Sequence, residues 1–220
     1  MIFQTAVSQT ADEIIQNHIE AIGGKEKIKS IKTMIFEGSN KRPGKERIFK
    51  SYIVHDSAAR TENTDNGIYG FGIVTKTEGW TYSTKTPGTS IKKKSKQELK
   101  ESQWVLDLHG PLIDYKEKGN KVTYLGREAI NNNECFKVRL VKTDKKAFIY
   151  YFDSTFFITR VVYLKHNWAV QLTVDYFYDK FQGFFFVTKG IRLEDGMEMT
   201  YTNYQVNPEI DRALFVPRKP

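Results

Sequence analysis

The segment Val170-Gln171-Leu172-Thr173-Val174-Asp175-Tyr176 decides the fold class of this chain. Its apolar and polar residues alternate, which is typical of a β-strand with one dry face and one wet face. The same alternation recurs in 191–194 and 197–202, and fifteen Phe, Tyr and Trp residues, half of the protein's aromatics, lie within 148–186. We therefore expect an antiparallel sheet whose broad apolar face must be covered by helices, another sheet or a ligand.

The domain organisation follows from the length of 220 residues and from the absence of a low-complexity stretch between the strand patterns. A chain of this size can bury one large core, so we expect a single domain over 10–220. Residues 1–9 precede the first structured element. Ala6 and Ser8 have the spacing of a signal-peptidase site, so 1–9 is either the remnant of an export signal or a disordered N-terminus.

Two segments carry helix signals. Thr10 and Glu13 have the spacing of a capping box ahead of apolar residues at helical intervals, and Gly23-Gly24 supplies a stop, so we expect a helix over 11–22 and a short turn over 25–30. Ser95 and Glu98 repeat the capping box, which predicts a second helix over 95–108 that ends at Gly110-Pro111.

Strands dominate the rest of the chain. Two helices cannot cover both faces of so many strands, and large twisted sheets tend to curl. We therefore expect a mainly β fold with a few helices: a strongly curved, incompletely closed antiparallel half-barrel with helices over its concave face. Period-two patterns and turn residues predict eleven strands, near 32–39, 46–56, 67–76, 79–84, 121–127, 134–142, 146–153, 156–165, 168–179, 184–194 and 197–206.

Catalytic and metal-binding signatures are absent from the sequence. The four histidines, at 18, 55, 109 and 166, lack metal-ligand spacing, and no nucleophile elbow or phosphate-binding loop occurs. His18 lies beside the apolar face of its helix, which favours a packed residue. Cys135 has no local histidine partner and is interpreted as a small packed side chain. We predict no enzyme, no metal and no cofactor.

The formal net charge of +8 permits contacts with anionic lipids or acidic proteins. Lys92, Lys93 and Lys94 precede a predicted helix and could either hold an anionic headgroup or form a solvated loop. Nucleic-acid binding is disfavoured because the aromatic residues cluster elsewhere. No run approaches the ~20 apolar residues of a membrane span, so no transmembrane segment is expected.

Several segments together carry a family resemblance. They are 107–119 (DLHGPLIDYKEKG), 201–217 (YTNYQVNPEIDRALFVP), 11–15 (ADEII), 23–28 (GGKEKI) and 151–155 (YFDST). They resemble periplasmic outer-membrane lipoprotein-sorting-type proteins, the LolA/LppX-like superfamily. The resemblance implies an unclosed antiparallel barrel whose helices cover an apolar cavity for acyl chains. It also implies a gating arginine, for which Arg47 and Arg60 are the candidates.

The predicted function is a periplasmic carrier that binds acyl chains of lipids or lipoproteins during envelope trafficking and is monomeric. The alternative is a non-catalytic envelope scaffold of the same fold that binds a protein partner through its basic surface. Leu99, Trp104 and Leu106 are the predicted lid residues. The predicted cavity lining comes from in-phase apolar sets in the strands: Phe136, Val138, Leu140, Phe148, Tyr150, Phe152, Val170, Leu172, Val174, Met197, Met199 and Tyr201.

Overall fold

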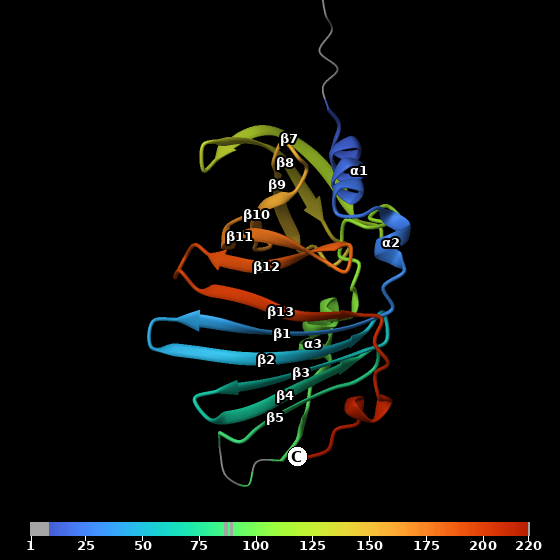
Figure 1. Ribbon diagram of the computed structural model, residues 1–220, viewed down its shortest axis with the longest axis vertical. Helices are drawn as coiled ribbons and strands as arrows, with labels where there is room; N and C mark the ends of the chain where they lie inside the picture. Colours follow the sequence, from blue (N-terminus) through green and yellow to red (C-terminus); the bar gives the residue numbers. More distant parts are fainter. Residues whose placement is uncertain (1–8, 86–87, 89, 220) are drawn as a thin grey trace, which may run out of the picture. The chain divides into compact units, whose positions relative to one another are not determined.

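The computed structural model describes residues 9–85, 88 and 90–219 (Figure 1). It contains thirteen β-strands, three short α-helices and two 3-10 helices, so the chain is mainly β as the sequence predicts. No helix in the described part of the chain is long and apolar enough to cross a membrane. The chain divides into two compact units, each built from two stretches of sequence. The single domain expected over 10–220 stays a prediction, and residues 1–8 of the predicted N-terminal segment lie outside the described residues.

The first unit comprises Met1–Lys25 and Pro111–Tyr176. Its strands pair in the order β11-β10-β9-β8-β7, and each neighbouring pair is antiparallel. Strand β11 ends beyond Tyr176, inside the second unit. The strands are β7 (Lys121–Ile130), β8 (Asn133–Val141), β9 (Ala147–Phe152), β10 (Ile158–Leu164) and β11 (Val170–Phe181).

Helix α1 (Ala11–Ala21) belongs to this unit and lies beside β7 (Figure 1). Thr10 caps it, because the Thr10 hydroxyl accepts from the Glu13 N–H and the Glu13 carboxylate accepts from the Thr10 N–H. This is the capping box predicted from the sequence. Its isoleucines, spaced at helical intervals, and His18 are buried, so α1 covers part of the unit's core.

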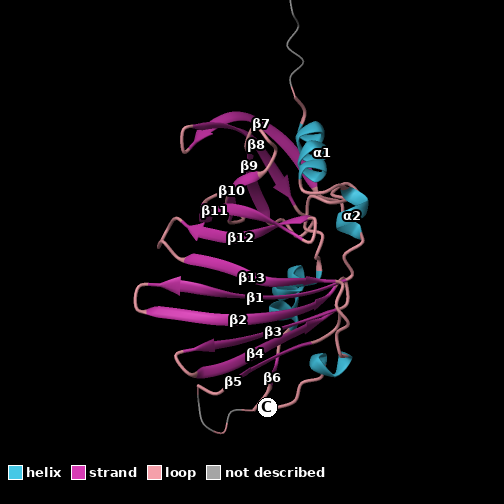
Figure 2. Cartoon of the chain, in the orientation of Figure 1, coloured by secondary structure: helices cyan, strands magenta, loops and turns pink. Residues whose placement is uncertain are grey.

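The second unit comprises Glu26–Gly110 and Phe177–Pro220. Its strands pair in the order β6-β5-β4-β3-β2-β1-β13-β12. Figure 2 shows β1 to β5 as neighbouring strands of one layer. The strands are β1 (Thr33–Arg42), β2 (Lys45–Val54), β3 (Ala58–Asp65), β4 (Ile68–Thr75), β5 (Gly79–Ser83), β6 (Lys92–Lys93), β12 (Phe184–Arg192) and β13 (Glu198–Val206), and the helices are α2 (Lys25–Lys29), α3 (Lys96–Ser102), η1 (Gln103–Leu106) and η2 (Arg212–Phe215).

Helical segments cover both faces of the sheet in the second unit. On one face, Leu106 of η1 packs with Ile53, Ala59 and Val74, which are aligned across β2, β3 and β4. On the other face, Phe215 of η2 packs in a cluster with Phe71 and other buried residues. Burial of both faces explains why β4 contains apolar residues on consecutive positions.

The described strands form one sheet, in which β11 pairs with both β12 and β10. Strands β6 and β7 are its two edge strands and do not pair with each other, so the sheet is not closed. The predicted class, an unclosed antiparallel sheet with a few helices, is therefore confirmed. The sequence missed β3 and the two-residue strand β6. Strand β3 reads AARTENTD, and its small and polar residues hide the period-two pattern.

Candidate functional site

Predicted lining residues of the first unit meet on one sheet face. Leu140 of β8 is the register partner of Phe148 on β9. Phe148 in turn faces Tyr163 on β10, and Tyr163 faces Leu172 on β11. These four residues, together with Val122, which pairs with Leu140 from β7, form an apolar row across five strands. We call this set the outer row.

A second row runs parallel to it, two residues further along each strand. Val138, Tyr150, Val161 and Val174 are successive register partners from β8 to β11. All four are buried. Phe136 and Phe152 form a further pair at the next step. Residues predicted from separate strands therefore lie side by side on one continuous apolar surface.

Burial along this face is graded. Phe152, Val138 and Leu140 are fully buried. The Phe152 end is covered by α1, because the ring of His18 packs edge-on against Phe152 with centroids 5.2 Å apart. In the outer row only Leu140 is buried, whereas the side chains of Val122, Phe148, Tyr163 and Leu172 are half-buried.

The half-buried residues also contact each other. Phe148 and Tyr163 pack edge to face with centroids 5.3 Å apart. The hydroxyl groups of Tyr163 and Tyr176 form a 2.9 Å hydrogen bond. Burial raises the pKa of the Tyr163 hydroxyl, so this group stays protonated and neutral at physiological pH. The outer row thus carries no charge.

Lysines gather beyond the outer row, where the strands of the first unit begin or end. The β8–β9 hairpin carries Lys142, Lys145 and Lys146, and the β10–β11 hairpin carries Lys165. The two hairpins are neighbours because Ala147 pairs with Leu164. Lys121 begins β7 at the same edge. Asp144 forms ion pairs with Lys142 and Lys146 at 4.0 and 3.6 Å. We call the five lysines at 121, 142, 145, 146 and 165 the lysine edge.

The second unit carries its own aromatic face. Tyr201 of β13 lies 6.1 Å from Phe36 and 5.9 Å from Phe49, measured between ring centroids. The Tyr201 hydroxyl contacts the Met199 sulfur at 3.9 Å. Met197 lies before β13, in the hairpin where its carbonyl accepts from the Arg192 N–H. The predicted residues Met199 and Tyr201 therefore share a half-buried surface, and Met197 lies outside the strand.

The predicted lid residues have different surroundings. Leu106 is buried and Leu99 is partly buried in the cluster that contains Val74. Trp104 of η1 is 65% exposed. Two of the three therefore face the sheet, and their action as a lid stays a prediction.

Other predicted residues lie apart from these faces. Val170 is exposed at the start of β11. Lys92 and Lys93 are exposed in the edge strand β6, where Lys93 pairs with Glu78, and Lys94 donates from its backbone to Gly79. Their predicted role with headgroups is untested by the fold.

The two arginines considered for gating also differ. Arg47 is exposed. Arg60 is buried on the sheet face that packs against η2, where it donates to Glu62 at 2.8 Å and to the Leu214 carbonyl at 3.2 Å. Its guanidinium also lies 4.2 Å from the centre of the Phe71 ring. These contacts hold Arg60 between the sheet and η2.

Sequence reasoning missed several residues of the apolar face. Val161 and Tyr163 were missed because Val161, Val162, Tyr163 and Leu164 are consecutive apolar residues, which conceal the phase of β10. The alternation of Val122 and Tyr124 in β7 would have predicted that this strand adds residues to the apolar face. Sequence spacing also gave no sign of a histidine grouping, although the fold places His55, Asp107 and His109 together.

No protein-family model and no curated protein sequence matches the chain. Solved structures do resemble it. A LolA superfamily protein from Nitrosomonas europaea has a TM-score of 0.64 and 12% identity, over 96% of this chain and 99% of the other. A DUF1329 family protein from Desulfovibrio piger has a TM-score of 0.61 and 15% identity, over 92% and 95%.

A third structure, a Vibrio parahaemolyticus domain provisionally described as outer membrane lipoprotein-sorting, has a TM-score of 0.56 and 14% identity, over 93% of this chain and 95% of its own. Likeness at such low identity establishes the fold. The resemblance predicted from the sequence is thus confirmed at that level: this chain has the fold of LolA superfamily proteins.

Proposed function

We propose that this protein is a non-enzymatic carrier in the cell envelope that binds acyl chains of lipids or lipoproteins. The observation that carries the proposal is the outer row, an uncharged apolar strip that crosses five strands and stays half-buried in four of its five residues. An acyl chain laid along Phe148, Tyr163 and Leu172 would complete their burial. The buried second row, beside them on the same sheet face, would form a rigid wall of the site.

The energetics favour such a ligand without any special polar motif. Each methylene removed from water contributes about 0.8 kcal/mol, so a chain of roughly sixteen carbons gains on the order of 10 kcal/mol before ordering costs are subtracted. The lysine edge runs alongside this strip, at the ends of the same strands, and adds a place for an anionic headgroup. A fatty-acyl ligand with a negative head therefore matches both features.

The fold supports an envelope role. The Vibrio parahaemolyticus domain of the same fold is described by its connection to outer membrane lipoprotein sorting. We therefore propose a periplasmic location for an exported monomer that holds cargo in an apolar site. Met199 and Tyr201 of the second unit offer a similar half-buried surface, which makes them the next candidates for acyl contact.

Lipid extraction from the natively exported protein tests this function. The purified protein is extracted with organic solvent, the extract is analysed by mass spectrometry, and uptake of a fluorescent fatty acid is titrated. We expect a stoichiometric acyl lipid and saturable uptake. An empty protein that also takes up no fatty acid would refute the carrier and favour an envelope scaffold that binds a protein partner.

Two leucines provide matched variants. Leu164 and Leu172 are both half-buried and lie on neighbouring strands, but Leu164 packs on the opposite sheet face with Val162. Leu172→Asp should abolish fatty-acid uptake, and Leu172→Trp, which keeps the face apolar but fills it, should weaken uptake without unfolding. Leu164→Trp should bind as the unmodified protein does. Equal uptake by Leu172→Trp and Leu164→Trp would exclude the outer row as the binding site for the acyl chain.

A further inference from the structure

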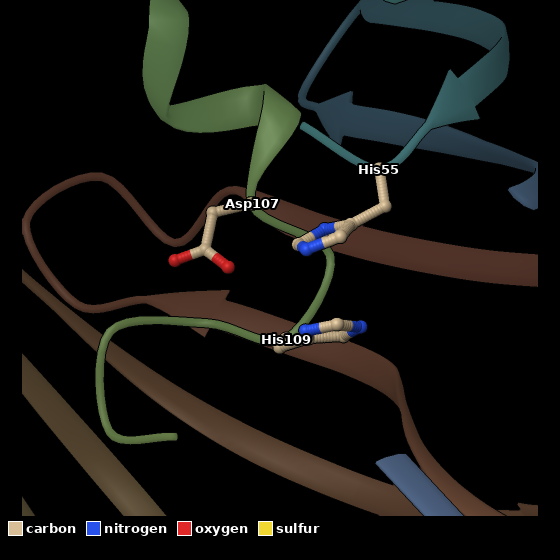
Figure 3. Close-up of side chains that lie close together, drawn as sticks. All are labelled: His55, Asp107 and His109. Carbon is tan, nitrogen blue, oxygen red and sulfur yellow. The ribbon is translucent and has the colours of Figure 1, made fainter. Parts of the chain in front are cut away.

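Three potential metal ligands converge in the second unit. His55 follows β2, whereas Asp107 and His109 follow η1 (Figure 3). One ligand atom from each residue lies within 4.8 Å of the other two. All three side chains are half-buried. Two imidazoles and one carboxylate form a donor set that suits Zn²⁺ and similar transition-metal ions, with a fourth position left for water.

Backbone hydrogen bonds hold both sides of the cluster in place. The N–H of His55 donates to the carbonyl of Lys32 at 2.8 Å, and the next N–H, of Asp56, donates to the carbonyl of Leu106 at 2.8 Å. The second bond ties the end of β2 directly to the end of η1. The ligands are therefore positioned by the fold and not by long flexible loops, which reduces the ordering cost of binding.

The ring of His109 is oriented for coordination. Its Nε2 lies 3.0 Å from the carbonyl oxygen of Ile31. A carbonyl can only accept, so Nε2 carries the proton and Nδ1 of the neutral ring keeps its lone pair. A histidine ligand usually donates its second ring N–H to a carbonyl or carboxylate in this way, which fixes the tautomer and the ring orientation.

The ring of His55 would have to turn to bind the same ion as His109. It stacks on His109 with centroids 3.7 Å apart and planes tilted by 30°. Its Nδ1 accepts from the N–H of Leu108 at 3.3 Å, which is long for a hydrogen bond. A metal ion at Nδ1 would replace this weak bond. The Nδ1 lone pair of His55 would then be donated to the ion.

We propose that His55, Asp107 and His109 bind a divalent transition-metal ion of the Zn²⁺ class. The ion fastens the segment after η1 to the end of β2. Leu106 at the end of η1 and Leu108 in this segment pack against the apolar face of the second unit. The ion would thus have a structural role and hold η1 against that face. Zn²⁺ affinity and the thermal stability of the protein measure this role.

The test uses untagged, EDTA-treated protein titrated with ZnCl₂ by calorimetry at pH 7.5. We expect one equivalent to bind, and a ligand present at a hundred times its Kd to raise Tm by about 5–10 °C. Co²⁺ in place of Zn²⁺ should give the visible absorption of a four-coordinate site.

Variants separate this site from adventitious binding. His109→Ala, His55→Ala and the nearly isosteric Asp107→Asn should each weaken Zn²⁺ binding at least about tenfold. His166→Ala, which removes an exposed histidine in the first unit, should bind as the unmodified protein does. Each variant is melted without metal, and Asp107→Asn keeps the test valid if a histidine variant unfolds. Absent Zn²⁺ binding, or binding that Asp107→Asn leaves unchanged, would overturn the proposal.

Discussion

The Nδ1–H group of His18 donates a 2.8 Å hydrogen bond to the backbone carbonyl oxygen of Phe156. His18 lies on α1, and Phe156 lies in the turn between β9 and β10. The bond therefore fastens the helix to the end of the apolar face at which Phe152 is fully buried. A neutral ring fits this place, and burial lowers the pKa of His18 to about 4.

The lowered pKa predicts acid lability. Unfolded His18 has a pKa near 6.5, so below pH 6.5 the unfolded state takes up a proton that the folded state does not bind. Stability falls as pH decreases from 6.5 to about 4, by about 3 kcal/mol in all. Urea unfolding at several pH values measures this slope. His18→Gln, which cannot titrate, should have a flatter profile, and identical slopes would contradict the assignment.

Arg160 and Asp175 should form an interdependent pair. They are cross-strand partners, and both guanidinium nitrogens Nε and Nη2 donate to the carboxylate, the latter at 2.7 Å. Their side chains are 18% and 12% exposed. Asp175→Leu alone should therefore destabilise the fold by about 2–3 kcal/mol, because it leaves a partly buried guanidinium without its carboxylate.

The double variant is the control for this pair. Arg160→Leu/Asp175→Leu should recover most of the lost stability, since two apolar side chains can replace a buried ion pair at little cost. Denaturant unfolding of the single and double variants completes the cycle. Additive losses in the double variant would show that the two residues act separately.

Local signals in the sequence predicted the helices and most of the strands. Thr10 with Glu13 and Ser95 with Glu98 are capping boxes in the structure, as their spacing implied. Such features depend on residues within one turn of each other. Strand β3 escaped prediction because its small and polar residues show no period-two pattern, and the burial of Ala59 comes from Ile53 and Val74 on the strands paired with it.

The candidate sites were less predictable, because they depend on register and long-range contacts. The alternation in β8 and β9 showed which residues share a face of each strand. It could not show that Leu140 stands opposite Phe148, because the hairpin loop fixes that register. His55 and His109 are more than fifty residues apart and meet only because the segment after η1 returns to the end of β2.

Two glycines in strand interiors should respond oppositely to alanine. A Cβ on Gly38 would overlap the carbonyl oxygen of Thr200 and come within 2.6 Å of Cζ of Phe49, whereas a Cβ on Gly72 would meet no atom within 4 Å. Gly38→Ala should cost about 1–3 kcal/mol through overpacking. Gly72→Ala should be neutral or stabilise by up to about 1 kcal/mol. Thermal melts compare them, and equal effects would contradict the close packing at Gly38.

The lysine edge predicts a preference for anionic headgroups. Lys145 and Lys165 are exposed on its two neighbouring hairpins. Reversing both charges, in Lys145→Glu/Lys165→Glu, should weaken binding of lysophosphatidylglycerol about three- to tenfold at low salt, because exposed charge pairs contribute roughly 0.2–1 kcal/mol each. Binding of lysophosphatidylcholine, which has the same acyl chain but no net charge, should change little.

The control moves the same charge change to the second unit. Lys92→Glu/Lys93→Glu alters two exposed lysines of β6 and has an identical effect on net charge. If the headgroup lies at the lysine edge, this variant should retain most of its affinity for lysophosphatidylglycerol, since it leaves all five lysines of that edge in place. A larger loss of affinity with Lys92→Glu/Lys93→Glu would place the headgroup beside β6. Equal losses in the two variants would mean that the net charge of the protein alone sets the preference for anionic headgroups.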